Sequence, residues 1–449
     1  MKNLQQLKKY LKDIFKKDKS QLLTNMLIVG IVTVVVKVIS FYKEILIAKE
    51  YGVSELLDTF LIAILVPSFI QSVFINAYSS VFIPNYLLEK DKQKDTSAFQ
   101  TSSYIITFTI AIVMILITYL GINIYLELLF PGHETVYYDL IKAQIIIILP
   151  CIIFWAFSSL TTGLLMTDNE YLLSSTNAIF IPLGVIFALF FHNQLAEKTL
   201  AIGTLGGSIL SFIYLLIIGF KKRLIKLGKP DFRSANMKVL LKQIPAKITS
   251  GLINGVNPMI DQYFSAQLTL GAIAALNYGY KIPMVTIGLI SGPIGNTVLP
   301  YFSGEAVKSI SNVYLKLKEF LKKSFIATAI LTIFLIILSK PIIIAFFERG
   351  AFTSENTDLV YLIQQMYFIQ IPFYIVGVIM NKYLTAINKN NFLVVSSILS
   401  FLLNISLNYT LLEIIGIKGL ALATSLVSVL NSLVIYLYIK YQYENSINV

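Results

Sequence analysis

The chain has 449 residues and a formal net charge of +12, and 56% of its residues are hydrophobic against 13% charged. Its mean hydropathy is +0.75, and its apolar runs repeatedly reach the roughly 20 residues that cross a bilayer as a helix. This composition excludes a soluble globular protein, whose core could not hide such runs. The single cysteine, Cys151, excludes an internal disulfide.

The apolar runs predict an all-α polytopic membrane protein with twelve membrane-spanning helices. The predicted ranges are 21–48, 56–88, 100–124, 138–166, 171–191, 197–220, 240–268, 271–303, 317–345, 357–385, 391–412 and 417–441. Residues 1–20 precede the first span and place leucines at helical spacing against a face of lysines, which indicates a basic amphipathic segment on the membrane surface. A disordered basic tail is the alternative for this segment.

The basic residues are distributed unevenly between the two sides of the predicted topology. Most of the 36 lysines and arginines lie in residues 1–20, in the loops that follow even-numbered spans, and in the region from Lys221 to Lys247. Because cytoplasmic loops carry the excess of Lys and Arg, these segments and both termini are predicted to be cytoplasmic. The positive charge therefore indicates membrane topology, and no nucleic acid partner is expected.

The two halves of the sequence resemble each other. Pro67 and Pro84 are 17 residues apart in the second span, and Pro283 and Pro300 have the same separation in the eighth. An even number of spans per half predicts two six-helix lobes related by a pseudo-two-fold axis along the membrane normal. The predicted organisation is a basic segment at 1–20, lobes at 21–220 and 240–441, a cytoplasmic linker at 221–239 and a tail at 442–449. Pro67 and Pro283 are predicted to act as hinges or helix breaks.

No feature of the sequence indicates an enzyme. It has no phosphate-binding glycine loop, no cluster of metal-ligand residues and no outward loop large enough for a catalytic centre. A transporter without cofactors, or a membrane scaffold that transports nothing, are the classes that remain.

Three charged residues interrupt the first span, although a charge at the centre of a bilayer is unfavourable by roughly 3 kcal/mol. Lys43 and Glu44 are adjacent and should point to different sides of a helix, so we expect no salt bridge between them. Lys37 and Lys43 are therefore predicted to face a water-filled cavity and meet an anion, with snorkelling to the membrane surface as the alternative for Lys43. In the second half, Lys281 either faces the same cavity or pairs with Asp261.

Three stretches resemble the MviN/MurJ lipid II flippase family of the multidrug/oligosaccharidyl-lipid/polysaccharide exporter superfamily. They are "KVISFYKEILIAKEYGVSELLDTFLIAILVPSFIQSVFINAYSSVFIPNY", "MIDQYFSAQLTLGAIAALNYGYKIPMVTIGLISGPIGNTVLPYFS" and "PIIIAFFERGAFTSENT". The resemblance implies that Lys37, Lys43 and Lys281 hold basic positions in a substrate cavity. It also implies that Asp58 stands at an acidic helix start.

The sequence also departs from the family pattern. The three cavity positions carry lysine in place of arginine, which keeps the charge and loses the bidentate geometry. Gln71 stands where the family has another arginine, and it is therefore grouped with the three lysines as a predicted substrate-binding residue of the cavity. Twelve spans are predicted where typical members have fourteen. We therefore expect either the family's substrate or a different lipid-linked glycan.

The function predicted from these observations is a secondary flippase of the bacterial cytoplasmic membrane. It would move lipid II, an undecaprenyl-diphosphate-linked precursor of peptidoglycan, between leaflets by alternating access. The alternatives are a flippase for a capsule, exopolysaccharide or O-antigen unit, and a drug/cation antiporter. We expect a monomer without cofactors, driven by membrane potential or by a cation such as Na⁺ or H⁺. Glu44, Asp58 and Asp261 are the candidates for ion coupling or for structural charges.

Overall fold

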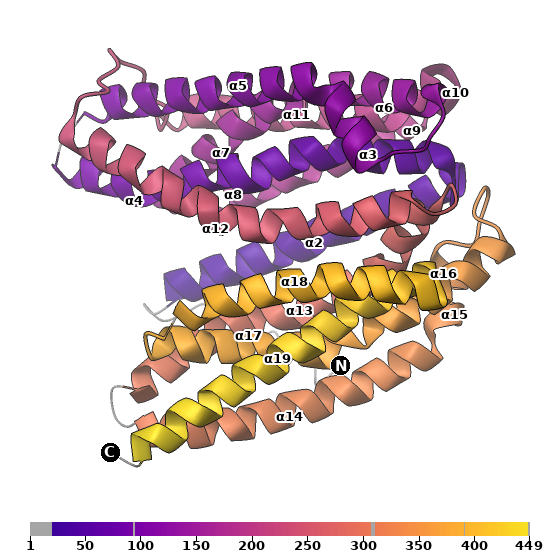
Figure 1. Cartoon of the computed structure of the whole chain (residues 1–449). Coiled ribbons are helices and arrows are strands. Elements are labelled where there is room, and N and C mark those ends of the chain that lie inside the picture. The colour runs from indigo at the N-terminus through magenta and orange to yellow at the C-terminus, as the bar shows by residue number, and fades with distance from the viewer. Residues whose placement is uncertain (1–19, 93–94, 307–309, 390, 448–449) are drawn as a thin grey trace, which may run out of the picture. The chain divides into compact units, whose positions relative to one another are not determined.

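The structure is a computed structural model that describes residues 20–92, 95–306, 310–389 and 391–447 (Figure 1). Within these residues every regular element is a helix. The predicted amphipathic segment at 1–20 lies outside the described residues, apart from Ser20.

The first half of the chain contains long helices that are interrupted by short irregular turns. They are α2 (Ser20–Tyr51), α3 (Glu55–Ile70), the π-helix η1 (Gln71–Ile75), α4 (Asn76–Lys92), α5 (Ser97–Leu129), α6 (Thr135–Ile148), α7 (Cys151–Thr167), α8 (Tyr171–Thr176), η2 (Asn177–Ile179), α9 (Phe180–Leu189), α10 (His192–Leu195), η3 (Ala196–Lys198) and α11 (Thr199–Lys221).

The second half follows a similar plan with fewer interruptions. It consists of α12 (Ala235–Ala266), α13 (Ala272–Ala306), α14 (Ile310–Ile337), α15 (Ser339–Phe346), α16 (Ser354–Phe368), α17 (Gln370–Ala386), α18 (Asn391–Ile415) and α19 (Ile417–Ile447). α19 therefore continues through most of the residues predicted as a tail.

The predicted all-α membrane class is confirmed. Ten helices or helix runs among the described residues are long and apolar enough to cross a membrane. α2 and α12, which have 32 residues each, are long enough to be the remaining two of the twelve predicted spans.

The prolines do not break the helices that contain them. α13 runs without interruption from Ala272 to Ala306 through Pro283, so the predicted break at Pro283 is wrong. A membrane helix tolerates proline because neighbouring helices and local adjustments satisfy the carbonyl that the ring leaves free. Pro67 also lies inside a helix, but four residues later the helix changes to the π-helix η1. The predicted role of Pro67 and Pro283 as hinges stays a prediction.

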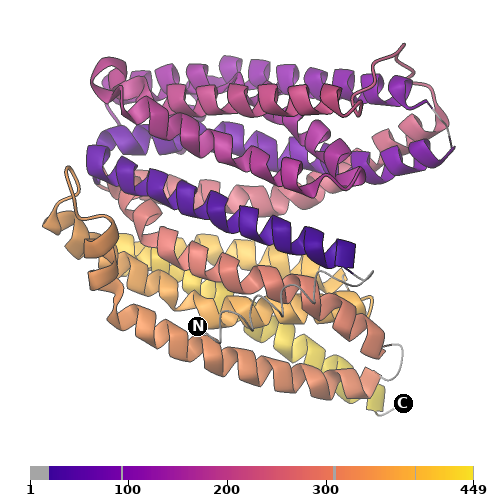
Figure 2. The same ribbon diagram turned by 180° about the vertical axis from the view of Figure 1, so that it is seen from behind.

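The described chain forms two compact units. The first comprises the residues up to Ile47, Ala63–Ile124 and Thr135–Leu252, and the second comprises Ala48–Ile62, Tyr125–Glu134 and the residues from Ile253 onward. Two segments of the first half therefore belong to the second unit: Ala48–Ile62, with the end of α2 and the start of α3, and Tyr125–Glu134, with the end of α5. In both views of the molecule α14 forms the outer edge of that unit (Figures 1 and 2).

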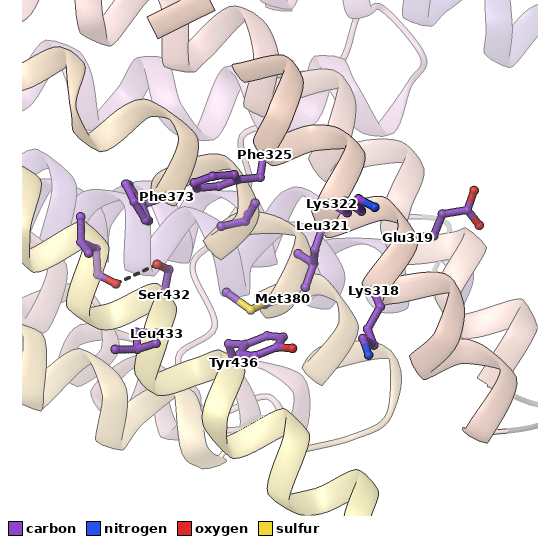
Figure 3. A pocket seen from close by; sticks show the side chains of 12 residues that line it. Lys318, Glu319, Leu321, Lys322, Phe325, Phe373, Met380, Ser432, Leu433 and Tyr436 are labelled. Carbon is purple, nitrogen blue, oxygen red and sulfur yellow. Dashed lines mark hydrogen bonds between the residues drawn. The ribbon is translucent and has the colours of Figure 1, made fainter. Parts of the chain in front are cut away.

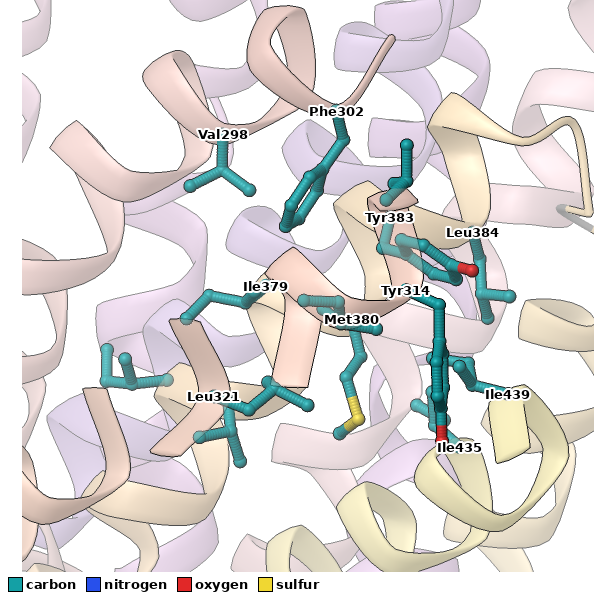
Figure 4. Close-up of a cluster of buried hydrophobic side chains, with 14 of the residues drawn as sticks. Val298, Phe302, Tyr314, Leu321, Ile379, Met380, Tyr383, Leu384, Ile435 and Ile439 are labelled. Atoms are coloured by element: carbon teal, nitrogen blue, oxygen red, sulfur yellow. The ribbon is translucent and has the colours of Figure 1, made fainter. Parts of the chain in front are cut away.

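Each unit has its own apolar core. The core of the first unit joins α4, α5, α7 and α12 through residues such as Phe82, Phe99 and Leu164. The core of the second unit joins α13, α14, α17 and α19, where Phe302, Tyr383 and Ile435 are fully or almost fully buried (Figure 4). These cores fix the helices within a unit as rigid neighbours.

The predicted linker is bound to the first unit. Gln100 of α5 donates its Nε2 to the Leu224 carbonyl at 3.0 Å and accepts the Lys226 N–H on its Oε1 at 2.9 Å. Thr101 accepts the Gly228 N–H at 2.9 Å. The chain that connects α11 to α12 is therefore held by α5 until α12 begins.

Candidate functional site

The charges of α2 form a pair that the sequence analysis did not expect. Lys43 Nζ lies 2.8 Å from Glu44 Oε1, with the side chains 22% and 14% exposed. The expectation that these two residues would not interact is wrong. Their Cβ atoms diverge, but the long lysine stem can bend back around the helix to its neighbour. Lys37, on the same helix, is half-buried.

Gln71 opens the π-helix η1 and lines a cavity of about 370 Å³ inside the first unit. The other polar groups around this cavity are neutral, and they include Asn76, Ser158 and Asn177. Neither Lys37 nor Lys43 is among the residues that line it. Gln71 is therefore placed in a neutral polar cavity, whereas its grouping with the lysines stays a prediction.

Asp58, near the start of α3, is buried in the second unit with 2% of its surface exposed. Its Oδ2 accepts the Gly271 N–H at 2.7 Å, and its Oδ1 accepts the Ala274 N–H at 2.6 Å. Gly271 immediately precedes α13 and Ala274 lies in its first turn, where the N–H groups have no backbone partners within the helix. The carboxylate therefore caps α13 and also complements its dipole.

The turn before Asp58 is held by the loop that leads into α16. Ala351 N donates to the Lys49 carbonyl at 2.8 Å. A Cβ on Gly52, whose φ is +55°, would stand 2.3 Å from the Ala351 carbonyl oxygen, so only glycine fits this contact. Thr353 and Asn356 form a capping box at the start of α16. Two of the three stretches that resemble the flippase family therefore meet within one unit.

Asp261 of α12 lies beside two asparagines of α18. Its Oδ1 accepts Asn408 Nδ2 at 2.9 Å and Asn404 Nδ2 at 3.4 Å. Asn408 is fully buried, and its own Oδ1 has no hydrogen-bond partner among the described residues. A carboxylate and two amides bring together the kind of oxygen groups that hard cations such as Na⁺ prefer.

The asparagines were missed in the sequence analysis. They lie four residues apart, on one face of an apolar helix, and this spacing was the signal that could have found them. Lys281, the other predicted site residue of this unit, is half-buried on α13. Its pairing with Asp261 stays a prediction. So does its approach to Lys37 and Lys43, which belong to the first unit.

The fold places the chain among membrane transporters of the multidrug/oligosaccharidyl-lipid/polysaccharide class. A solved structure titled "Lipid II flippase MurJ, inward closed conformation" matches with a TM-score of 0.81 and 25% identity, over 92% of this chain and 87% of that one. An inward-facing multidrug MATE transporter matches with a TM-score of 0.76 and 12% identity, over 91% and 95% of the two chains, and shows the fold alone.

The family is shown by the sequence. The family model "Lipid II flippase MurJ" matches residues 47–447, and the chain belongs to that family. The lipid II flippase MurJ of Thermosipho africanus is 28% identical over 93% of this chain and 86% of its own length. A probable lipid II flippase MurJ of Synechocystis sp. is 26% identical over 88% and 77% of the two lengths.

Proposed function

We propose that this membrane protein moves lipid II from the inner to the outer leaflet of the bacterial cytoplasmic membrane. The observation that carries the proposal is the match of the lipid II flippase family model to residues 47–447. One relative named a lipid II flippase matches over 93% of this chain and 86% of its own length.

Lys37, Lys43 and Lys281 are proposed to bind the diphosphate of the substrate. Each of them lies within a long helix of largely apolar composition, where a charge is unfavourable and is normally kept for function. Glu44 holds Lys43 at 2.8 Å, so we expect the diphosphate to displace this carboxylate or to share the ammonium with it. The prenyl tail would remain in the surrounding lipid.

Asp261, Asn404 and Asn408 are proposed to bind the coupling cation. Support comes from the burial of the two asparagines and from the Oδ1 of Asn408. This oxygen has no hydrogen-bond partner among the described residues, and a bound cation would supply one. A rotation of either amide exchanges its NH₂ for its oxygen and presents a further ligand. Na⁺ is the cation that we expect first, because the atoms that these three side chains can present as ligands are oxygens.

The transport mechanism is proposed to be alternating access by a secondary transporter, with no nucleotide and no covalent step. A charge that crosses the membrane with the substrate gains about 2.3 kcal/mol per 100 mV of membrane potential. The protein is proposed to act as a monomer with both termini in the cytoplasm, as the distribution of lysines indicates.

Complementation tests the proposed substrate. We expect the chain to support growth of a bacterium from which its own lipid II flippase has been depleted. We also expect a deletion of this chain in its own host to accumulate lipid II. If the deleted cells grow without accumulating lipid II and lack a surface polysaccharide, the substrate is another lipid-linked glycan. Failure to complement at normal expression would also contradict the proposal.

A further inference from the structure

An apolar groove of about 570 Å³ lies on the second unit between α14 and α19 (Figure 3). α14 and α19 both pack against α17, which supplies the floor of the groove through Val376 and Met380. Both floor residues are buried, at 8% and 1% exposure, whereas Leu433 on the wall is 50% exposed. The groove therefore opens on the outside of the bundle, where a membrane helix meets lipid.

Two aromatic pairs join the helices that form the groove. Tyr314 of α14 stacks on Tyr443 of α19 with ring centroids 3.8 Å apart. Phe325 of α14 and Phe373 of α17 meet edge to face at 5.3 Å. Between these pairs the two outer helices leave a slot. From Lys318 to Phe325 the slot follows α14 for about 10 Å, at 1.5 Å per residue.

The polar group in the deep part of the slot already has a hydrogen-bond partner. Ser432 is the neutral polar residue of its wall, and its hydroxyl donates to the Val429 carbonyl at 2.8 Å in its own helix (Figure 3). The surfaces of Phe325, Phe373 and Met380 surround it. A hydrocarbon chain fits such a slot because burying each methylene is favourable by about 0.8 kcal/mol.

The charged residues that line the slot are two lysines and one carboxylate, Glu319, so the lining has a net positive charge. Lys318 and Lys322, one turn apart on α14, are the two lysines, and both are exposed. Among the residues that the structure describes, neither lysine has an ion-pair partner, whereas Lys323 is bound to Glu319 at 2.5 Å. Tyr436 stands beside them, as tyrosines do at the level of lipid headgroups.

We propose that this groove binds one anionic phospholipid of the membrane, with an acyl chain in the slot and its phosphate at Lys318 and Lys322. The lysines lie at the end of α14 that the charge distribution predicts to be cytoplasmic, where basic pockets between membrane helices select anionic headgroups. The site is separate from the cavity lysines and from Asp261, and it does not depend on the proposed transport activity.

Lipid binding to the purified full-length protein tests this site. Native mass spectrometry would count the lipids retained during titration with phosphatidylglycerol, phosphatidylcholine or undecaprenyl phosphate. We expect one phosphatidylglycerol to bind in preference to the other two lipids. The Lys318→Gln/Lys322→Gln variant should bind it more weakly by about fivefold for each lysine removed. Val376→Phe, which narrows the slot, should weaken the binding of both phospholipids.

A matched control is available on α12. Lys238 and Lys242 are also exposed, are also four residues apart and line no pocket described here, so Lys238→Gln/Lys242→Gln should leave the affinity unchanged. Equal losses in the two double variants would overturn the proposal, as would equal binding of the two phospholipids. Preferential binding of undecaprenyl phosphate, lost in Lys318→Gln/Lys322→Gln, would assign the groove to a prenyl chain and would also overturn it.

Discussion

Two carboxylates of the second unit, Asp58 and Asp261, occupy contrasting environments. Each oxygen of Asp58 accepts a backbone N–H at the start of α13, from Gly271 at 2.7 Å and from Ala274 at 2.6 Å. Among the described residues, Asp261 accepts hydrogen bonds from side-chain amides, which can rotate away. Both residues were predicted as candidates for coupling or structure. These contacts give Asp58 a structural role at the start of α13. Asp261 remains the residue that we propose for the ion site.

Replacement of Asp58 by alanine should destabilise the protein. It leaves the first-turn N–H groups of α13 without an acceptor, and hydrogen bonds to a charged group contribute about 2 kcal/mol each. The unfolding temperature in detergent measures the loss. Glu55→Ala, on the first turn of the same helix, should change the stability by less than about 0.5 kcal/mol. If the two variants unfold at the same temperature, the cap does not stabilise α13.

Replacement of Asp261 by asparagine should abolish the dependence of transport on Na⁺. Asparagine keeps the size and the contacts to α18 but removes the charge that holds a cation. Transport by the native chain should rise with Na⁺ concentration at constant ionic strength, and transport by Asp261→Asn should be slow and insensitive to Na⁺. An unchanged Na⁺ response in Asp261→Asn would exclude this residue as the cation site.

At the scale of the helix, close backbone approach distinguishes α9 and α11 from their neighbours. A Cβ on Gly207 of α11 would lie 2.6 Å from Ile181 Cα, whereas a Cβ on the adjacent Gly206 would meet nothing within 4 Å. Each half also contains a serine–asparagine hydrogen bond. Ser211 of α11 donates to Asn177 of η2, the segment that leads into α9, and Ser396 of α18 donates to Asn431 of α19. Small residues and such bonds are what joins helices in lipid.

The two glycines give a matched pair of substitutions. Gly207→Ala forces α9 and α11 apart and should lower the free energy of unfolding by about 1–3 kcal/mol. Gly206→Ala should leave it unchanged or raise it by up to about 1 kcal/mol, because alanine favours the helix. Thermal unfolding of both variants in the same detergent compares them. A loss as large in Gly206→Ala would show that packing against α9 is not the cause.

At the scale of the whole molecule, the sequence was sufficient to predict the membrane-spanning helices and the family. Apolar runs of sufficient length fix membrane helices because the bilayer demands them. Contacts between residues that are far apart in the sequence could not be predicted from it. The cap that Asp58 provides joins it to Gly271, 213 residues along the chain, and no local pattern indicates it. The Lys43–Glu44 pair was missed because the analysis followed Cβ directions and neglected the reach of the side chains.

The same reasoning explains why the second unit contains segments from the first half. The segment Ala48–Ile62 contacts the rest of the second unit through the Lys49 carbonyl and the Asp58 carboxylate. Both accept hydrogen bonds from backbone N–H groups. A backbone donor is present at almost every residue, so the sequence does not mark the one that is used. Such contacts are visible only in the folded chain.

The most direct test of lipid II transport by this protein is to measure the movement of lipid II across the bilayer of proteoliposomes that contain the purified chain. The native chain should move lipid II between leaflets, and Lys43→Ala/Lys281→Ala should be at least about tenfold slower because it loses charge-assisted contacts to the diphosphate. Lys198→Ala/Lys389→Ala, which removes one exposed lysine from each unit, should move it at the native rate. No movement by the native chain, or native rates in Lys43→Ala/Lys281→Ala, would contradict a flippase that recognises its substrate through these lysines.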